Sequence, residues 1–147
     1  GKHAPLPVIM VDIPGSHYWQ EWQRFLEDNL ASCHFIRPED LNLFQITDSI
    51  PEVLQAIERF YYRYHSMRYV DSRLVIRMQT PLSDRTMQTI RQEFSDLLTP
   101  GGAFRQGPAL PKEADDPDLA SLPRLIIDFN RTTFARLKDL IDAINRA

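Results

Sequence analysis

The stretch LPVIMVDI, residues 6–13, decides the fold of the first half of this 147-residue chain. Its apolar residues follow one another without alternating with polar ones, and Pro14-Gly15 ends the run. Such an unbroken run is typical of a strand that is covered on both faces in a parallel sheet. We therefore expect residues 6–13 to form a central or near-central parallel strand.

A helix, a second strand and a second helix are expected after this strand. The first helix has an apolar stripe of Trp19, Trp22, Phe25, Leu26 and Leu30. Residues 43–47 (LFQIT) predict the second strand, and Ser49 with Glu52 forms the pattern of a capping box that starts the second helix. The stripe of that helix is Val53, Leu54, Ile57, Phe60, Tyr61 and Tyr64. Strand–helix–strand units of this kind build parallel sheets with right-handed crossovers.

From Tyr69 onward the expected order changes to β-α-β-β-α. Strands are predicted at residues 73–78, 103–106 and 125–129, with Leu74 and Ile76 on one face of the first of them. One helix is capped by Ser83, and the last begins near Phe134. Residues 108–123 are rich in proline and acidic residues and predict an exposed loop. The order is close to a ferredoxin-like unit that lacks one strand.

The change in the order of elements divides the expected α/β chain into two parts, residues 1–66 and 67–147, and the composition predicts a soluble, cytoplasmic protein. With 43% hydrophobic and 25% charged residues, the chain is ordinary for a globular protein. Its net charge of −3 gives no general attraction to nucleic acid or to a membrane surface. No apolar run approaches the roughly 20 residues that span a bilayer, and a single cysteine, Cys33, gives no internal disulfide. Residues 2–7 are typical of a linker, so we expect a domain excised from a larger protein.

Most motifs that carry chemistry are absent from the sequence. No G-x-G-x-x-G, P-loop, G-x-S-x-G, H-E-x-x-H or C-x-x-C pattern occurs. Cys33-His34 is expected to be structural or at the surface rather than a metal site. The acidic cluster of Glu113, Asp115, Asp116 and Asp118 lacks the pattern of an EF-hand loop and predicts a solvated loop. The sequence therefore predicts no catalytic residue, no metal site and no cofactor.

Four residues just past the first strand are the candidate ligand-binding residues: Asp12, Gly15, His17 and Tyr18. The carboxyl edge of an open parallel sheet is where ligands bind. Asp12 or His17 could hydrogen-bond a ribose or act in proton transfer, and Tyr18 with Trp19 could stack on a base. The alternative is structural, with Trp19 packed in the core and Ser16 capping the helix.

Basic and aromatic residues interleave at residues 59–69 (RFYYRYHSMRY). This composition occurs in single-strand nucleic-acid surfaces and equally in protein interfaces. Because the chain is acidic overall and the stretch ends an amphipathic helix, we expect an interface within the chain or with a second subunit. No nucleic-acid or membrane partner is expected.

The first half resembles the carboxyl-terminal end of the LOG family. The residues that carry this are Pro7-Val8-Ile9-Met10-Val11-Asp12, Gly15, Tyr18-Trp19, Phe35-Ile36-Arg37-Pro38-Glu39-Asp40-Leu41 and Thr47-Asp48. These Rossmann-like nucleotide-binding proteins were long labelled "possible lysine decarboxylase". Where His34 stands the family pattern usually has Gly, and near residues 12–16 it tends to have Asn and a shorter loop.

The resemblance implies a fragment whose catalytic motif lies elsewhere. Characterised family members cleave the N-glycosidic bond of a nucleoside 5′-monophosphate, with the motif P-G-G-x-G-T-x-x-E, and Pro100-Gly101-Gly102 imitates only its first three residues. We expect the rest of the Rossmann-like domain, a second copy of the chain and a nucleotide as partners. The alternative function is a non-enzymatic small-ligand sensor or oligomerisation domain.

Overall fold

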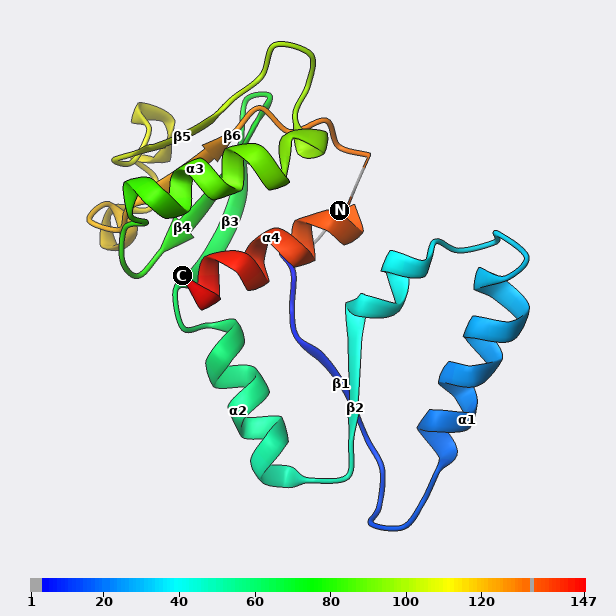
Figure 1. Cartoon of the computed structure of the whole chain (residues 1–147). Helices are drawn as coiled ribbons and strands as arrows, with labels where there is room; N and C mark the ends of the chain where they lie inside the picture. The colour runs from blue at the N-terminus through cyan, green and yellow to red at the C-terminus, as the bar shows by residue number, and fades with distance from the viewer. Residues whose placement is uncertain (1–3, 133) are drawn as a thin grey trace. The chain divides into compact units, whose positions relative to one another are not determined.

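The chain forms two separate sheets, one parallel and one antiparallel, in the computed structural model (Figure 1). The structure describes residues 4–132 and 134–147. The sheets belong to two compact units, Pro5–Arg59 and Phe60–Ala147, and Ala4 is grouped with the second of them. The boundary between the units lies at Arg59, a few residues before residue 66, where the sequence analysis divides the chain.

The Pro5–Arg59 unit has the predicted order of strand, helix, strand and helix. Strand β1 (Val8–Val11) leads to α1 (Tyr18–Phe25), which continues as a π-helical segment, Leu26–Ala31. A 3-10 helix, Pro38–Leu43, precedes β2 (Phe44–Thr47), and α2 (Ile50–Phe60) follows. Strands β1 and β2 pair in parallel, as expected for strands joined by a helix.

Strand β1 is not buried on both faces, contrary to the sequence analysis. Val8 is 48% exposed and Val11 41% exposed, while Ile9 and Met10 are half-buried. The reason is that β2 is the one strand paired with β1 in the described chain. Within the described part of this unit, the buried residues are Asp12 and Thr47, and both are polar.

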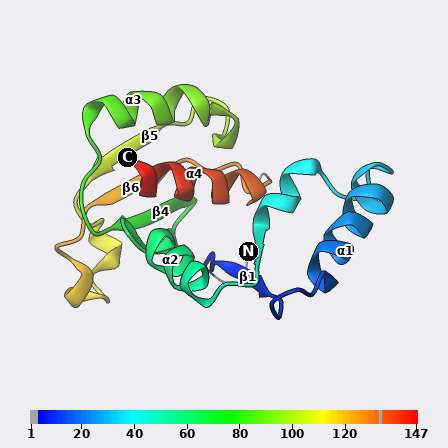
Figure 2. The same cartoon turned by 60° about the horizontal axis from the view of Figure 1, so that its bottom comes forward.

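The Phe60–Ala147 unit is a four-stranded antiparallel sheet with strand order β3-β4-β6-β5. Its strands are β3 (Tyr64–Val70), β4 (Arg73–Met78), β5 (Phe104–Gly107) and β6 (Arg124–Ile127). Helices α3 (Asp84–Glu93) and α4 (Phe134–Arg146) lie side by side on one face of this sheet (Figure 2). The side chain of Ser83 caps α3 as predicted, because its Oγ accepts a hydrogen bond from the Thr86 N–H at 3.1 Å.

Strand β3 corrects the sequence analysis. The helix that was expected to run through Tyr64 ends at Phe60, and Tyr64–Val70 pairs with β4 instead. Residues 59–69 are therefore mainly a strand rather than the end of a helix. Tyr64 is 1% exposed and belongs to the core between sheet and helices.

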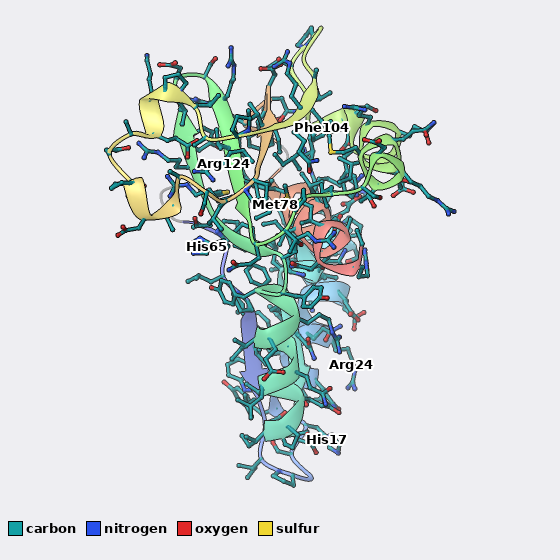
Figure 3. All side chains as sticks on the ribbon, turned by 90° about the vertical axis from the view of Figure 1, so that its left-hand side faces the viewer. His17, Arg24, His65, Met78, Phe104 and Arg124 are labelled. Carbon is teal, nitrogen blue, oxygen red and sulfur yellow. The ribbon has the colours of Figure 1, made fainter. Side chains whose placement is uncertain are left out.

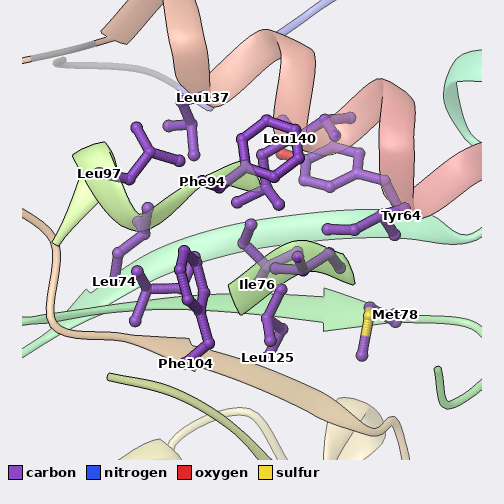
Figure 4. Close-up of a cluster of buried hydrophobic side chains, with 14 of the residues drawn as sticks. Tyr64, Leu74, Ile76, Met78, Phe94, Leu97, Phe104, Leu125, Leu137 and Leu140 are labelled. Atoms are coloured by element: carbon purple, nitrogen blue, oxygen red, sulfur yellow. The ribbon is translucent and has the colours of Figure 1, made fainter. Parts of the chain in front are cut away.

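The core of this unit lies between the sheet and the two helices (Figure 4). It is formed by apolar side chains that alternate along the strands and recur at helical spacing along α3 and α4. Leu74 and Ile76 of β4 point into this core as predicted, together with Leu125 of β6 and Leu140 of α4. Each of these four side chains is 0% exposed.

Part of the 108–123 loop packs on the opposite face of the sheet, although most of its residues are exposed, as predicted. Val70, Val75 and Ile126 form a second apolar cluster there, with Leu110 of the loop packed against it. Glu113, expected to be solvated, is 2% exposed. The correction has an electrostatic cause, since this carboxylate lies against two buried arginines of the sheet.

Candidate functional site

A polar cavity of about 260 Å³ lies at the carboxyl ends of β1 and β2. One wall consists of residues from the segment that follows β1 and begins α1, and the other comes from the end of β2 and the start of α2. Asp12, Gly15 and His17 line this cavity, so three of the four candidate residues come together. Tyr18 is not among the lining residues.

The turn after β1 directs the chain into α1. Gly15 has φ of +82°, and the Ser16 N–H donates to the Ile13 carbonyl at 2.9 Å. Proline followed by a glycine with positive φ is the pattern of a type II turn. The turn places His17 beside the strand ends, at the tip of this unit in Figure 3, where its Nδ1 lies 3.0 Å from Oε1 of Gln20.

Asp12 ties the start of α1 to the end of β2. Its backbone N–H donates to the Thr47 carbonyl at 2.9 Å, and its carboxylate Oδ2 accepts from the Trp19 N–H at 3.2 Å. A carboxylate that accepts from a first-turn N–H stabilises the start of a helix. Asp12 is 9% exposed. It therefore has a structural role in addition to lining the cavity.

The start of α2 forms the other wall, with a hydrogen-bond pattern that differs from the predicted capping box. Ser49 Oγ accepts from the Glu52 N–H at 3.5 Å, as expected. The Glu52 carboxylate accepts from the Thr47 hydroxyl rather than from the Ser49 N–H, which donates to Thr47 Oγ1 at 3.1 Å. Thr47 thus joins the end of β2 to the first turn of α2.

The aromatic residues of α1 pack along the helix. The ring of Tyr18 lies edge-on to Trp19 at 4.9 Å, and Trp19 lies edge-on to Trp22 at 5.9 Å. Trp22 then contacts Phe44 of β2 at 5.2 Å. Ser16 Oγ accepts from the Tyr18 N–H at 3.3 Å. Trp19 is half-buried rather than part of a buried core, and the N-cap of α1 is His17, without a side-chain cap, so the structural alternative for Trp19 and Ser16 is met only in part.

Hydrogen-bond acceptors predominate on the cavity wall. Asp12, Asp48 and Glu52 bring three carboxylates to one small space, next to the Thr47 hydroxyl. Carboxylates accept hydrogen bonds from hydroxyl and amino groups and repel a phosphate. No group of three His, Cys, Asp or Glu residues in the described chain could hold a metal ion.

Sequence reasoning missed Asp48 and Glu52 as lining residues. The available signal was topological, because the ends of adjacent parallel strands lie at the same edge of a sheet. The residues that follow β2 should therefore have been paired with those that follow β1.

Neither Cys33-His34 nor residues 59–69 are among the residues that line this cavity. Cys33 is exposed and free, and His34 has φ of +60°. The side chains of residues 59–69 go to different places: Tyr64 is buried, Arg63 Nε donates to Thr80 at 3.1 Å, and Arg68 pairs with Asp115 at 2.8 Å.

Comparison with protein-family models, with curated proteins and with solved structures gave no match for this chain. The family resemblance therefore rests on the residues quoted above. Over the part of the chain that the structure describes, no helix has both the length and the apolar character needed to cross a membrane.

Proposed function

We propose that this chain is the C-terminal part of a LOG-like nucleotide-binding protein, in which Pro5–Arg59 contributes the last two strands and helices of a Rossmann-like sheet. The observation that carries this proposal is the polar cavity at the carboxyl ends of β1 and β2. Open parallel sheets bind their ligands at this edge. The chain's own role is structural or regulatory.

The wall chemistry indicates which part of a nucleotide this cavity fits. Asp12, Asp48 and Glu52 suit the ribose hydroxyls or a base amino group, and they disfavour the phosphate. The phosphate and the reacting bond would be held by the rest of the parent protein. In N-glycosidic cleavage, a carboxylate from that part would stabilise the positive charge that develops on the sugar.

The exposed apolar surface of Pro5–Arg59 supports a larger parent sheet. Of the fourteen large apolar residues that are exposed in the described chain, eleven belong to this unit. They include Leu6 at 63% and Ile13 at 76%, on either side of β1. Two parallel strands alone bury too little apolar area to be stable. Further parallel strands and helices are therefore expected to cover these faces.

The backbone at His34 supports the family resemblance independently. His34 has φ of +60°, a left-handed conformation that glycine adopts without steric cost. The LOG pattern usually has Gly at this position, directly before Phe35-Ile36. The glycine of the family pattern would therefore suit the backbone conformation that His34 adopts here.

For the Phe60–Ala147 unit we propose a ferredoxin-like module that serves assembly or regulation. A fourth strand, β3, lies beside β4, but it precedes the β-α-β-β-α order, whereas the last strand of a ferredoxin-like unit follows its second helix. Helix α3 connects β4 to β5 with β6 between them, which is the split β-α-β connection of ferredoxin-like units.

Titration with AMP, followed by amide NMR shifts, tests the proposed cavity. Saturable shifts are expected at Gly15, His17 and Thr47, and Asp12→Asn should weaken binding about tenfold through loss of a charge-assisted hydrogen bond. Asp28→Asn is the matched control, because Asp28 is exposed on the π-helical segment and lies outside the cavity. Equal affinity for AMP in the two variants, or no amide shift at the highest AMP concentration, would refute the nucleotide site.

Hydrolysis of AMP tests the expectation that the chain has no catalytic centre of its own. No free adenine above background is expected. Release of adenine that disappears in Asp12→Ala would overturn this part of the proposal while leaving the binding site in place.

A further inference from the structure

We propose that α2 couples the candidate cavity to the Phe60–Ala147 unit, so that a ligand in the cavity and the packing at the end of α2 stabilise each other. The ligand part of this proposal rests on the nucleotide site proposed above. The helix is one continuous element, Ile50–Phe60 (Figure 1). Glu52 of its first turn lines the cavity, and Phe60, its last residue, belongs to the core of the other unit.

Helix α2 has little packing between its two ends. Val53 and Ala56 are half-buried and Phe60 is buried, while the other residues of α2 are exposed. An isolated helix of 11 residues is only marginally stable in water, and most helical stability in proteins comes from the packing of an apolar face. Whether α2 forms therefore depends strongly on the contacts that fix its two ends.

The amino end of α2 is fixed by residues that also line the cavity. The Ser49 N–H donates to Thr47 Oγ1 at 3.1 Å, and the Val53 N–H donates to the Ser49 carbonyl at 3.1 Å. The Thr47 hydroxyl donates to the Glu52 carboxylate. Because Glu52 belongs to this turn, its carboxylate keeps its place on the cavity wall only while the turn is formed. A ligand that contacts Glu52 therefore binds the helical state of α2 in preference to the unfolded one.

The carboxyl end of α2 is fixed by the core and by a side-chain cap. Phe60 is 5% exposed, and its ring lies edge-on to Tyr64 at 5.3 Å. The Phe60 carbonyl is one of the groups that the end of a helix leaves without an intrahelical partner. It accepts a hydrogen bond from Nδ2 of Asn145 at 2.6 Å. Loss of this cap should therefore favour unfolding of α2 from its carboxyl end.

The two ends are coupled because both sets of contacts favour the same helical state. A ligand at the first turn orders the helix, so less conformational entropy remains to be lost when Phe60 and Asn145 make their contacts. Linkage makes the effect reciprocal, and the contacts of Phe60 raise the affinity for the ligand by the same factor. The helix–coil equilibrium of α2 is the two-state element that this coupling requires.

Two substitutions at Gln55 change the stability of α2 without altering either of its ends. Gln55 is exposed in the middle of the helix. At such a position glycine disfavours the helix about fivefold relative to alanine. In NMR titrations of the whole chain, the dissociation constant for AMP should therefore be roughly twofold to fivefold higher in Gln55→Gly than in Gln55→Ala.

Amide hydrogen exchange of the chain without AMP tests the coupling from the other end. Asn145→Ala removes the cap of the Phe60 carbonyl, so exchange at Val53 and Leu54, in the first half of α2, should become about tenfold faster. Glu113→Gln is the control, because Glu113 lies on the opposite face of the sheet and its replacement weakens the same unit away from α2. Exchange at Val53 and Leu54 should stay unchanged in this control.

The outcomes separate the coupling from the nucleotide site. If AMP does not bind to the unsubstituted chain, the nucleotide site is refuted and the exchange experiment alone decides the coupling. Equal exchange rates at Val53 and Leu54 in Asn145→Ala and Glu113→Gln would overturn the coupling. If AMP binds with equal affinity to Gln55→Gly and Gln55→Ala, the nucleotide site stands and the coupling is wrong.

Discussion

Arg77 of β4 and Arg124 of β6 lie directly opposite each other in the antiparallel sheet, and both are buried. Glu113 Oε1 accepts hydrogen bonds from Nε of Arg77 at 3.0 Å and from Nε of Arg124 at 3.2 Å. Figure 3 shows Arg124 beside the loop that carries Glu113. Two like charges opposite each other destabilise a sheet unless a counter-charge lies between them. Glu113 provides that charge and fixes the loop to the sheet.

Replacement of Glu113 by Gln should therefore destabilise the Phe60–Ala147 unit strongly. Removal of one partner from a buried ion pair leaves uncompensated charge, which costs about 3–5 kcal/mol of unfolding free energy. Urea unfolding, followed through the NMR amide signals of β4, measures this loss. Asp115→Asn is the control: the Asp115 carboxylate is exposed, so the urea midpoint of this variant should hardly differ from that of the unsubstituted chain. Equal midpoints for the two variants would contradict this account.

The same carboxylate should make this unit sensitive to acid. Burial alone would raise the pKa of Glu113, but hydrogen bonds from the Leu110 N–H, Arg124 and Arg77 outweigh it and lower the pKa below its usual range. A lowered folded-state pKa gives stability that is present above the unfolded pKa, about 4.3, and is lost as the pH falls below it. Urea midpoints from pH 6 to about pH 2 should fall in the unsubstituted chain and be flatter in Glu113→Gln.

Tyr64 should show the opposite pH dependence. Its hydroxyl is buried and has no hydrogen-bond partner among the described residues. Burial, with a smaller contribution from the charge of Tyr61, raises the pKa of Tyr64 to about 12. Because the folded state favours the neutral phenol, the contribution of Tyr64 to stability is fully present below its unfolded pKa of about 10. This contribution is lost as the pH rises toward about 12.

Replacement of Tyr64 by Phe tests both consequences. Removing an unsatisfied buried hydroxyl should raise the unfolding free energy at pH 7 by about 1 kcal/mol, and the loss at high pH should become smaller. Tyr62→Phe serves as the control because Tyr62 is 68% exposed. A Tyr64→Phe chain less stable than the control at pH 7 would show that the hydroxyl has a partner after all.

Among the polar residues of α4, replacement of Asn145 should lower the unfolding free energy most. Its Oδ1 accepts from the Arg63 and Tyr64 N–H groups, each at 2.9 Å, and its Nδ2 donates to the Phe60 carbonyl at 2.6 Å. Asn145→Ala leaves three backbone groups without partners and should cost about 2–4 kcal/mol. Arg146→Ala, on the exposed neighbour, should be nearly neutral in the same urea experiment. A loss below about 1 kcal/mol for Asn145→Ala would mean that water replaces these bonds.

His34→Gly should stabilise the Pro5–Arg59 unit. Relief of the left-handed strain at φ of +60° is worth about 1 kcal/mol. Both tryptophans of the chain, Trp19 and Trp22, lie in this unit, so urea unfolding followed by tryptophan fluorescence reports on it alone. Cys33→Gly is the control, because the φ of Cys33 is not positive and a glycine there relieves no strain. It should lower the unfolding free energy, since it adds conformational freedom to the unfolded chain. Destabilisation by His34→Gly would argue against the family pattern at this position.

Regular periodicity explains which elements the sequence could predict. Helix α4 was found because Leu137, Leu140, Ile141 and Ile144 recur at helical spacing and all are buried. Strand β4 was found because Leu74 and Ile76 alternate with Arg73, Val75 and Arg77. In both cases one local pattern agrees with the tertiary structure.

Strand β3 could not be predicted because an irregularity interrupts its alternation. The pairing with β4 shifts between Tyr64 and Ser66, so Tyr64, Met67 and Tyr69 all contact the core. Together with Phe60 and Tyr61, these positions imitate the spacing of a helix. A bulge that inserts one residue into a strand has this effect on any pattern with a period of two.

The cavity and the Glu113 contacts were only partly accessible from sequence. Asp12 and His17 follow a recognisable strand, whereas Glu52 reaches the same cavity through the pairing of β1 with β2. Glu113 stands in a proline-rich acidic segment that gave no sign of burial. Arg77 and Arg124, inside or at the edge of apolar strands, were the available sign that a carboxylate must cover them.

The hydrogen bond from Asn145 to the Phe60 carbonyl also joins segments that lie 85 residues apart in the sequence. Asn145 lies in the last turn of α4, and Phe60 ends the helix that precedes β3, so this hydrogen bond holds the two segments next to each other. Because the contact is this long in sequence, it forms late in folding, after the chain between the two segments has collapsed. The end of α4 therefore closes the Phe60–Ala147 unit only once its strands are in place.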